Sequence, residues 1–118
     1  MEKVNLGQKF GLFAEYWSPK IVGEINDFHV KLVKLRGEFI WHLHEKEDEL
    51  FLVIKGKLVI RLRDRDINLS EGEFFIVPSG VEHMPVGDDE VHVLLLEPKT
   101  TLNTGNVRNE RTVEAERI

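Results

Sequence analysis

The chain has 118 residues, of which 42% are hydrophobic and 31% charged, a length and balance typical of one globular domain with a buried core. Its net charge is −5, from 16 basic and 21 acidic residues, and the basic residues are scattered, which argues against nucleic-acid binding. No apolar run could span a bilayer, the first residues lack the apolar segment of a signal peptide, and the absence of cysteine excludes disulfides and thiolate ligands. We therefore expect a cytoplasmic protein with neither a nucleic-acid nor a membrane partner.

Most of the chain is predicted to form short strands. Residues 1–20 contain aromatic side chains without a clear period and are expected to pack as an arm. Strands are predicted over 28–32, 39–44, 49–54, 58–63, 67–69, 74–77 and 91–97, with no helix between residues 28 and 97. The tail over 98–118 is polar, and a loop, a short helix after Val113 and partial disorder all stay open. Such short strands, with a turn every 8–12 residues or so, are typical of an all-β sandwich or barrel.

Two histidines, His42 and His44, lie two positions apart in the predicted strand 39–44. Alternate residues of a strand share a face, so both imidazoles would point the same way, together with Ile40. A charged turn follows, and a hairpin there would bring Glu49 back beside His44. The alternative is that the two histidines are an ordinary surface pair and that the acidic run is a solvated turn.

A second segment, GEFFIVPSGVEH, favours the metal-binding interpretation. A strand ends at Val77, a Pro-Ser-Gly turn follows, and His83 opens the next segment. In a small β-barrel such a turn can return His83 toward the same cavity. Three imidazoles and one carboxylate suit one divalent transition metal ion: iron, manganese, nickel, cobalt, copper or zinc. Six-coordination would leave open positions for substrate, oxygen or water.

The two segments also carry a regular spacing of glycines and potential ligands. The first contains Gly, H-x-H, Glu and Gly, at Gly37, His42, His44, Glu49 and Gly56. The second contains Gly, P-x-G and His, at Gly72, Pro78, Gly80 and His83. Together they resemble the motifs of the cupin superfamily, specifically the small single-domain cupins. One residue fewer than usual separates Gly37 from His42, and Gly87 stands where the second motif often has Asn. Neither position is a ligand.

The resemblance implies an all-β fold, a double-stranded β-helix or jelly-roll cupin barrel. It would be a single cupin domain over residues 1–118, with a barrel core at about 28–97, an N-terminal arm and a polar C-terminal tail. The metal ligands that it implies are His42, His44, Glu49 and His83. The flanking segments look like those of stand-alone cupins loosely described as mannose-6-phosphate-isomerase-like, yet no phosphate loop and no arginine fork is apparent near the ligands. Cupins commonly pair through their sheets, so a homodimer is implied, with Tyr16 and Trp17 as candidates for packing on the partner.

The lining of the pocket is predicted from the same alternation. We expect Ile40, Phe51, Val53, Met84 and His92 to contribute to it. Burial in the core is the simpler interpretation for Phe51, Val53 and Met84. His92 is either a histidine satisfied in the core or on the surface, or a proton-transfer group facing the cavity.

The predicted function is that of a metal-binding small cupin acting as an enzyme on a small organic molecule, with dioxygenase- or isomerase-type chemistry. Glu49 would be a permanent ligand or a carboxylate that swings away to act as a base. Two alternatives stay open because one fold hosts many functions: a non-catalytic module that binds or senses a small molecule, and a metal-free structural cupin.

Overall fold

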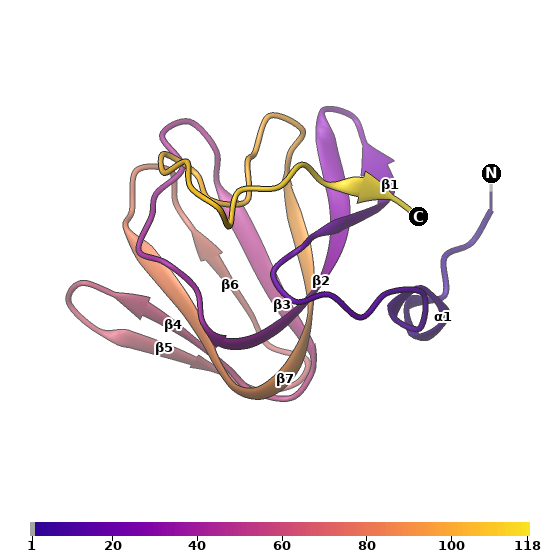
Figure 1. The fold of residues 1–118 in the computed structure, drawn as a ribbon, viewed down its shortest axis with the longest axis horizontal. Coiled ribbons are helices and arrows are strands. Elements are labelled where there is room, and N and C mark those ends of the chain that lie inside the picture. The colour runs from indigo at the N-terminus through magenta and orange to yellow at the C-terminus, as the bar shows by residue number, and fades with distance from the viewer. Residues whose placement is uncertain (1) are drawn as a thin grey trace.

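The computed structural model describes residues 2–118 and consists mostly of strands (Figure 1). In chain order the elements are α1 (Leu6–Phe10), β1 (Lys20–Ile25), β2 (Phe28–Glu38), β3 (Glu49–Lys55), β4 (Leu58–Leu62), β5 (Asp66–Leu69), β6 (Phe74–Val77), β7 (His83–Pro98) and β8 (Glu116–Arg117). The predictions of an all-β fold and of no helix between residues 28 and 97 are confirmed. Among residues 2–118, no helix is long and apolar enough to cross a membrane.

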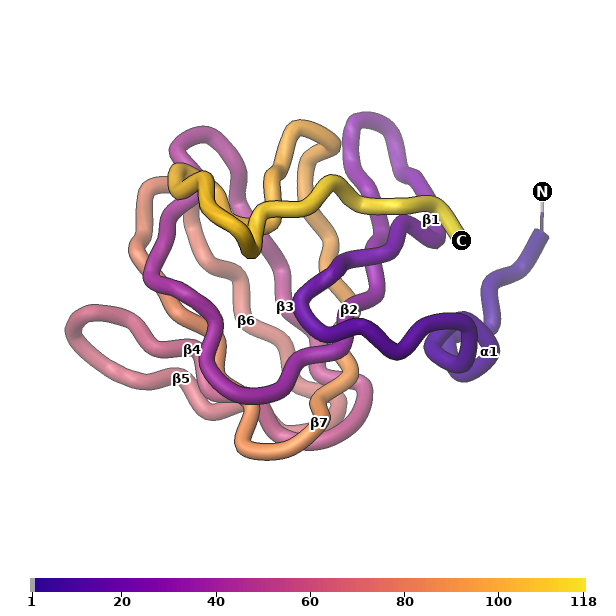
Figure 2. The backbone as a smooth tube through the Cα atoms, viewed as in Figure 1, coloured from indigo at the N-terminus to yellow at the C-terminus, as the bar shows by residue number. Residues whose placement is uncertain are grey.

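Strand β7 organises the sheet, because its 16 residues pair with three other strands. The strand order is β5-β4-β7-β2-β1-β8, and β3 pairs with both β6 and β7. Every pairing is antiparallel except that of β1 with β8. The backbone curls into the jelly-roll barrel that the sequence predicts (Figure 2).

The core lies inside this barrel, where alternate residues of the strands point inward. On β3 the buried residues are Glu49, Phe51 and Val53, while the residues between them are only half-buried. The main hydrophobic cluster is formed by Val33, Leu35, Phe51, Val53, Leu58, Ile60, Leu69, Val77, Val91, Val93 and Leu95. The barrel therefore has an apolar interior into which a few polar side chains project.

The N-terminal arm packs on the outside of the sheet. Phe10 and Phe13 form a second cluster with Leu32 of β2, whose side chain points outward and is nevertheless fully buried. Helix α1 begins after Asn5, whose side chain accepts a hydrogen bond from the Gln8 backbone at 3.0 Å. The helix lies beside the barrel in Figure 1. The arm thus covers apolar surface that the strands leave outside.

Several boundaries differ from the prediction. The predicted strand 39–44 is wrong: that segment is irregular and makes only an isolated bridge between His42 and His83. Strand β7 begins at His83 rather than at residue 91, and β1 was not predicted. Of the three possibilities left open for the tail, the structure shows turns, to which it adds the short strand β8.

Three turns of the barrel contain a glycine with positive φ, namely Gly56 (88°), Gly72 (82°) and Gly80 (80°). A side chain is strained in this region of backbone space, which glycine enters freely. At Gly56 a Cβ would also lie 2.9 Å from the carbonyl oxygen of Glu90, a backbone atom. The turn between β3 and β4 therefore needs a glycine for two reasons.

Candidate metal centre

Four predicted ligands come from three separate parts of the chain and meet inside the barrel. His42 and His44 lie on the connector 39–48 between β2 and β3, Glu49 is the first residue of β3, and His83 is the first residue of β7. Backbone hydrogen bonds join His42 and His83 in both directions, at 3.1 Å and 2.9 Å. The Gly80 backbone N–H donates to the His44 carbonyl oxygen at 2.7 Å. The connector is therefore held in place by the turn before β7, although it is not a regular strand.

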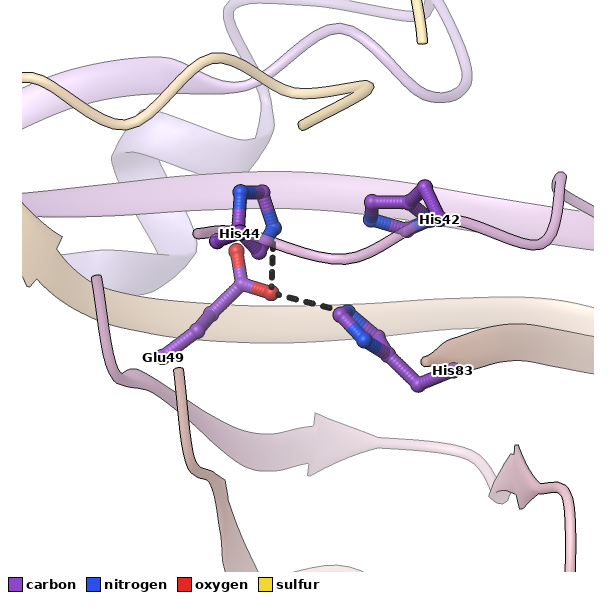
Figure 3. A group of neighbouring side chains, drawn as sticks. All are labelled: His42, His44, Glu49 and His83. Atoms are coloured by element: carbon purple, nitrogen blue, oxygen red, sulfur yellow. Dashed lines mark ion pairs between the residues drawn. The ribbon is translucent and has the colours of Figure 1, made fainter. Parts of the chain in front are cut away.

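The four side chains are almost fully buried, at 4%, 4%, 5% and 0% exposure for His42, His44, Glu49 and His83. One potential ligand atom from each lies within 4.8 Å of all the others. Glu49 Oε1 lies 3.3 Å from His44 Nε2 and 3.4 Å from His83 Nε2, between the two rings in Figure 3. Donors about 2.1 Å from one ion and at right angles would lie about 3 Å apart, so these spacings suit a common metal ion.

Hydrogen bonds on the far side of two rings orient the histidines. His42 Nδ1 lies 2.9 Å from the Ile40 carbonyl oxygen, and His83 Nδ1 lies 2.9 Å from the Val81 carbonyl oxygen. A carbonyl only accepts, so Nδ1 must carry the proton and Nε2 is left with a lone pair toward the cluster. Each ring is thus fixed in the tautomer that a metal ligand needs.

Several of the converging atoms have no partner. Within residues 2–118, His44 Nε2, His83 Nε2 and Glu49 Oε1 are buried without a hydrogen bond. Buried polar atoms are normally paired, since leaving one unsatisfied costs roughly 1–3 kcal/mol. A set of such atoms pointing at one another is what a metal ion would satisfy. The residues present therefore fit a bound divalent metal.

The charges of the cluster also favour a cation. Burial and the neighbouring charge of His83 lower the pKa of His42 to about 4, so its imidazole is neutral at neutral pH. Burial opposes the charge on Glu49, but contacts with Glu97, His44 and His83 outweigh it and hold its pKa well below the usual range. A neutral His42 imidazole and an ionised Glu49 carboxylate are in the protonation states that bind metal.

A second buried carboxyl, Glu97, lies next to Glu49 and was missed by the sequence analysis. It is 1% exposed, its Oε1 accepts a hydrogen bond from Lys31 Nζ at 2.8 Å, and its Oε2 has no partner within residues 2–118. Burial and the charge of Glu49 raise its pKa well above the usual range. The alternation of Val91, Val93 and Leu95 would have placed Glu97 on the inner face, which is the signal that could have found it.

The cavity beside the ligands is small, about 30 Å³, close to the volume of one water molecule in the liquid. Of the predicted lining residues, Phe51 does line it. Ile40 contributes only its carbonyl to His42, and Val53 and Met84 are buried elsewhere in the core.

His92 lies on the outer face of β7 rather than in the cavity. Its ring stacks on Phe10 at 4.4 Å, and its Nε2 lies 2.6 Å from Glu90. The reason is the alternation of β7, which turns Val91 and Val93 inward and the residue between them outward. Of its two sequence-based interpretations, the structure places His92 as a satisfied surface histidine.

Two aromatic side chains line the cavity next to His42. Trp17 and Phe39 both line it and stack on each other at 4.7 Å, and Phe39 meets the His42 ring edge-on at 5.5 Å. The Arg111 guanidinium lies 4.8 Å from the Phe39 ring centre and donates to the Glu38 and Phe39 carbonyl oxygens.

Trp17 therefore packs on its own barrel, whereas Tyr16 is partly exposed and donates to Glu90. Sequence alone gave no indication of this contact between arm, connector and tail.

Fold and site together define a barrel with a three-histidine, one-carboxylate cluster, and comparison with known proteins supplies the family. Residues 29–97 match the family model described as Cupin domain, which covers more than half of the chain. The chain belongs to the cupin family. A crystal structure of a cupin-2 domain protein from Shewanella frigidimarina is 45% identical, with a TM-score of 0.79, and the match covers 80% of this chain and 93% of that one.

Two curated relatives are more distant. The chain is 36% identical over 63 residues to the uncharacterized protein YdbB of Bacillus subtilis, a match covering 52% of this chain and 56% of the relative. It is 31% identical over 78 residues to 3-hydroxyanthranilate 3,4-dioxygenase 2 of Aspergillus fumigatus, covering 63% of this chain and 42% of the relative. The chain thus spans about half the length of these curated relatives, and their names describe them alone.

Proposed function

We propose that His42, His44, Glu49 and His83 hold one divalent transition metal ion, and that the loaded protein is an enzyme acting on a small organic molecule. The observation that carries this proposal is the convergence of buried, unpartnered ligand atoms within 4.8 Å of one another. The metal would supply Lewis acidity or a site for oxygen activation, as in dioxygenase- or isomerase-type chemistry. The distant dioxygenase relative supports the first of these types.

The protein's own residues would prepare the site. The backbone carbonyls of Ile40 and Val81 hold His42 and His83 in a fixed tautomer. Apolar residues of the wall, among them Val33, Phe51 and Leu95, exclude water and strengthen electrostatic interactions in the cavity. Glu49 would act as a permanent ligand or as a base that leaves the metal, and its contact with Glu97 gives it a polar neighbour in either position.

A second candidate is a module that binds or senses a small molecule without turnover, and it rests on the same cluster of buried ligand atoms. At about 30 Å³ the cavity admits a ligand of about the size of water. A larger molecule would have to displace side chains of the lining, which includes Trp17, Phe39 and Asn103. A module that binds its ligand through the metal would differ from the enzyme only in turnover.

Turnover separates the two candidates. Protein without a His tag would be loaded with each candidate metal and tested for oxygen uptake with hydroxylated aromatics and for isomerisation of small hydroxycarbonyl compounds. The enzyme predicts turnover that falls at least about 100-fold in His44→Ala, because a ligand is lost, and stays unchanged in His92→Ala. Full metal content without turnover of any compound would favour the binding module, and failure to bind any metal would reject both.

A further inference from the structure

A second pocket lies outside the metal cavity, between strands β1 and β2 and the C-terminal tail. Its volume is about 320 Å³, roughly ten times that of the metal cavity at about 30 Å³. The tail runs in front of the barrel toward β1 in Figure 2, where β8 pairs with Lys20 and Ile21. The pocket therefore exists because the tail folds back on the barrel, a contact that no pattern in the sequence indicates.

Cationic side chains dominate the lining of this pocket. Lys31, Lys99 and Arg108 line it together with His29, and Glu114 is the only carboxylate among the lining residues. The protein as a whole carries a net charge of −5. The lining of this pocket thus has an excess of positive charge, although the whole molecule is negative. Such a site is suited to attract anions.

The acidic residues that accept hydrogen bonds from two of these cations lie outside the lining. Lys31 Nζ donates to Glu97, which faces the metal cavity, and Lys99 Nζ donates to Glu24 at 2.8 Å. Arg108 is exposed to solvent and makes no hydrogen bond or ion pair with any residue from 2 to 118, so its five N–H donors are open to a ligand. The pocket thus presents N–H groups whose capacity is not used up by the protein.

His29 adds an independent sign of an absent ligand. Its side chain is only 12% exposed, and its Nδ1 is buried without a partner in the described chain. Burial and the charge of Lys31 lower the pKa of His29, so the ring is neutral at neutral pH and keeps one N–H to donate. The other ring nitrogen of His29, Nε2, lies 3.8 Å from Glu24 Oε1, which is beyond hydrogen-bond distance.

We propose that this pocket binds the oxyanion group of a small molecule, a carboxylate or a phosphate, through Arg108, His29 and Lys31. The planar guanidinium of Arg108 can donate two parallel hydrogen bonds to the oxygens of such a group, and His29 and Lys31 can each donate another. The pocket and the metal cavity share Pro19 and Asn103 in their linings, and the Lys31–Glu97 pair joins them. The anion site does not depend on a bound metal.

The test uses full-length protein stripped of metal by a chelator, in a phosphate-free buffer of low ionic strength. Inorganic phosphate and acetate are titrated in separate experiments and followed by calorimetry and by the ring ¹⁵N signals of the histidines, with His29 assigned through His29→Asn. Binding of either anion should shift the His29 signals. Tighter binding of phosphate would identify a phosphate group as the natural ligand chemistry, and tighter binding of acetate a carboxylate.

A charge reversal and its matched control decide the outcome. Arg108→Glu should weaken binding roughly tenfold or more, because it removes charge-assisted hydrogen bonds. Arg65→Glu makes the same charge change at a residue paired with Asp64, outside the pocket lining, and should leave the affinity within about twofold. Absence of binding, unshifted His29 signals, or equal weakening by both variants would overturn the proposal. Metal content, measured separately, tests the metal centre and not this site.

Discussion

At the scale of single residues, the four ligands are costly to bury without a metal. His42 has a hydrogen bond on its far side, yet its ring lies against His83 at 4.3 Å between ring centres. Protonating it inside the barrel would place a charge among apolar walls and other imidazoles. The metal-free protein should therefore resist protonation of His42 and be sensitive to acid.

The low pKa of His42 makes the stability of the metal-free protein depend on pH. The pKa of His42 is about 4 in the folded protein and about 6.5 when unfolded. Only the unfolded chain binds this proton between those values, so stability is fully present above pH 6.5 or so and is lost as the pH falls toward 4. The loss should be roughly 3 kcal/mol.

Urea unfolding of chelator-treated protein across this pH range would measure that loss. His42→Phe removes the titrating group and should flatten the profile between about pH 6.5 and 4. An identical slope in wild type and variant would show that His42 does not titrate as described.

At the scale of elements, the connector 39–48 shows what the sequence could and could not predict. The H-x-H alternation placed His42 and His44 together, and the Pro-Ser-Gly turn placed His83 opposite, because both depend on local backbone periodicity and turn chemistry. A regular strand was not needed, since a single bridge to His83 holds His42. The strand pattern alone predicted a sandwich or a barrel, and the resemblance of the two motifs to those of cupins implied the jelly-roll barrel.

What escaped prediction depends on contacts between distant parts of the chain. Asn106 and Leu43 are 63 positions apart, and nothing periodic in the tail indicates that they pair. Trp17 reaches the cavity from the arm by stacking on Phe39, which neither sequence segment reveals. Tertiary packing determines where Asn106 and Trp17 lie, so these contacts can be seen only in the three-dimensional structure.

The tail braces the ligand segment through Asn106. Its Oδ1 accepts from the Leu43 backbone at 3.0 Å, and its backbone N–H donates to the Leu43 carbonyl oxygen at 2.9 Å. Leu43 lies between two ligands, so Asn106→Ala should lower metal affinity by roughly 3- to 10-fold as well as stability by about 1 kcal/mol.

Asn109→Ala is the matched control for this brace, because the Asn109 side chain accepts only from Arg111 within the tail. It should cost similar stability and leave metal affinity unchanged in competition titrations with a chromophoric chelator. Equal losses of affinity in both variants would mean that the tail acts only through general stability.

The two glycine turns make a second matched pair. At Gly72, where φ is 82°, an added Cβ would have no atom within 4 Å. Gly72→Ala should therefore lower the free energy of unfolding by about 1 kcal/mol through backbone strain alone. Gly56→Ala adds a Cβ at 2.9 Å from the Glu90 carbonyl and should cost roughly 2–4 kcal/mol. Urea denaturation of both variants measures the difference, and equal costs would contradict the close approach at Gly56.

At the scale of the whole molecule, an apolar surface lies on the outer face of β3, β6 and β7. Phe74 and Ile76 are 60% and 47% exposed, and Leu50, Leu52 and Leu96 beside them are only half-buried. A contiguous apolar patch of this kind is uncommon on a monomer. We propose that two copies of the chain pair through this face, next to the region that the arm already covers.

Size measurement by light scattering tests this pairing. Wild type should have about twice the chain mass of 13.7 kDa, and Ile76→Asp should be monomeric because the charge would be buried in the interface. Val4→Asp makes the same charge change at an exposed residue of the arm and should stay dimeric. A wild type that is monomeric at about 100 µM would reject the pairing.

The most direct test of the central claim is the metal content of the untagged protein after reconstitution, measured by elemental analysis in wild type, His83→Ala and His92→Ala. We predict about one equivalent of a transition metal in wild type and in His92→Ala, whose ring lies on the outer face, and less than about a tenth in His83→Ala. Circular dichroism would verify that His83→Ala is folded. Less than a tenth of an equivalent in wild type, or equal metal in all three folded proteins, would contradict a metal site built from His42, His44, Glu49 and His83.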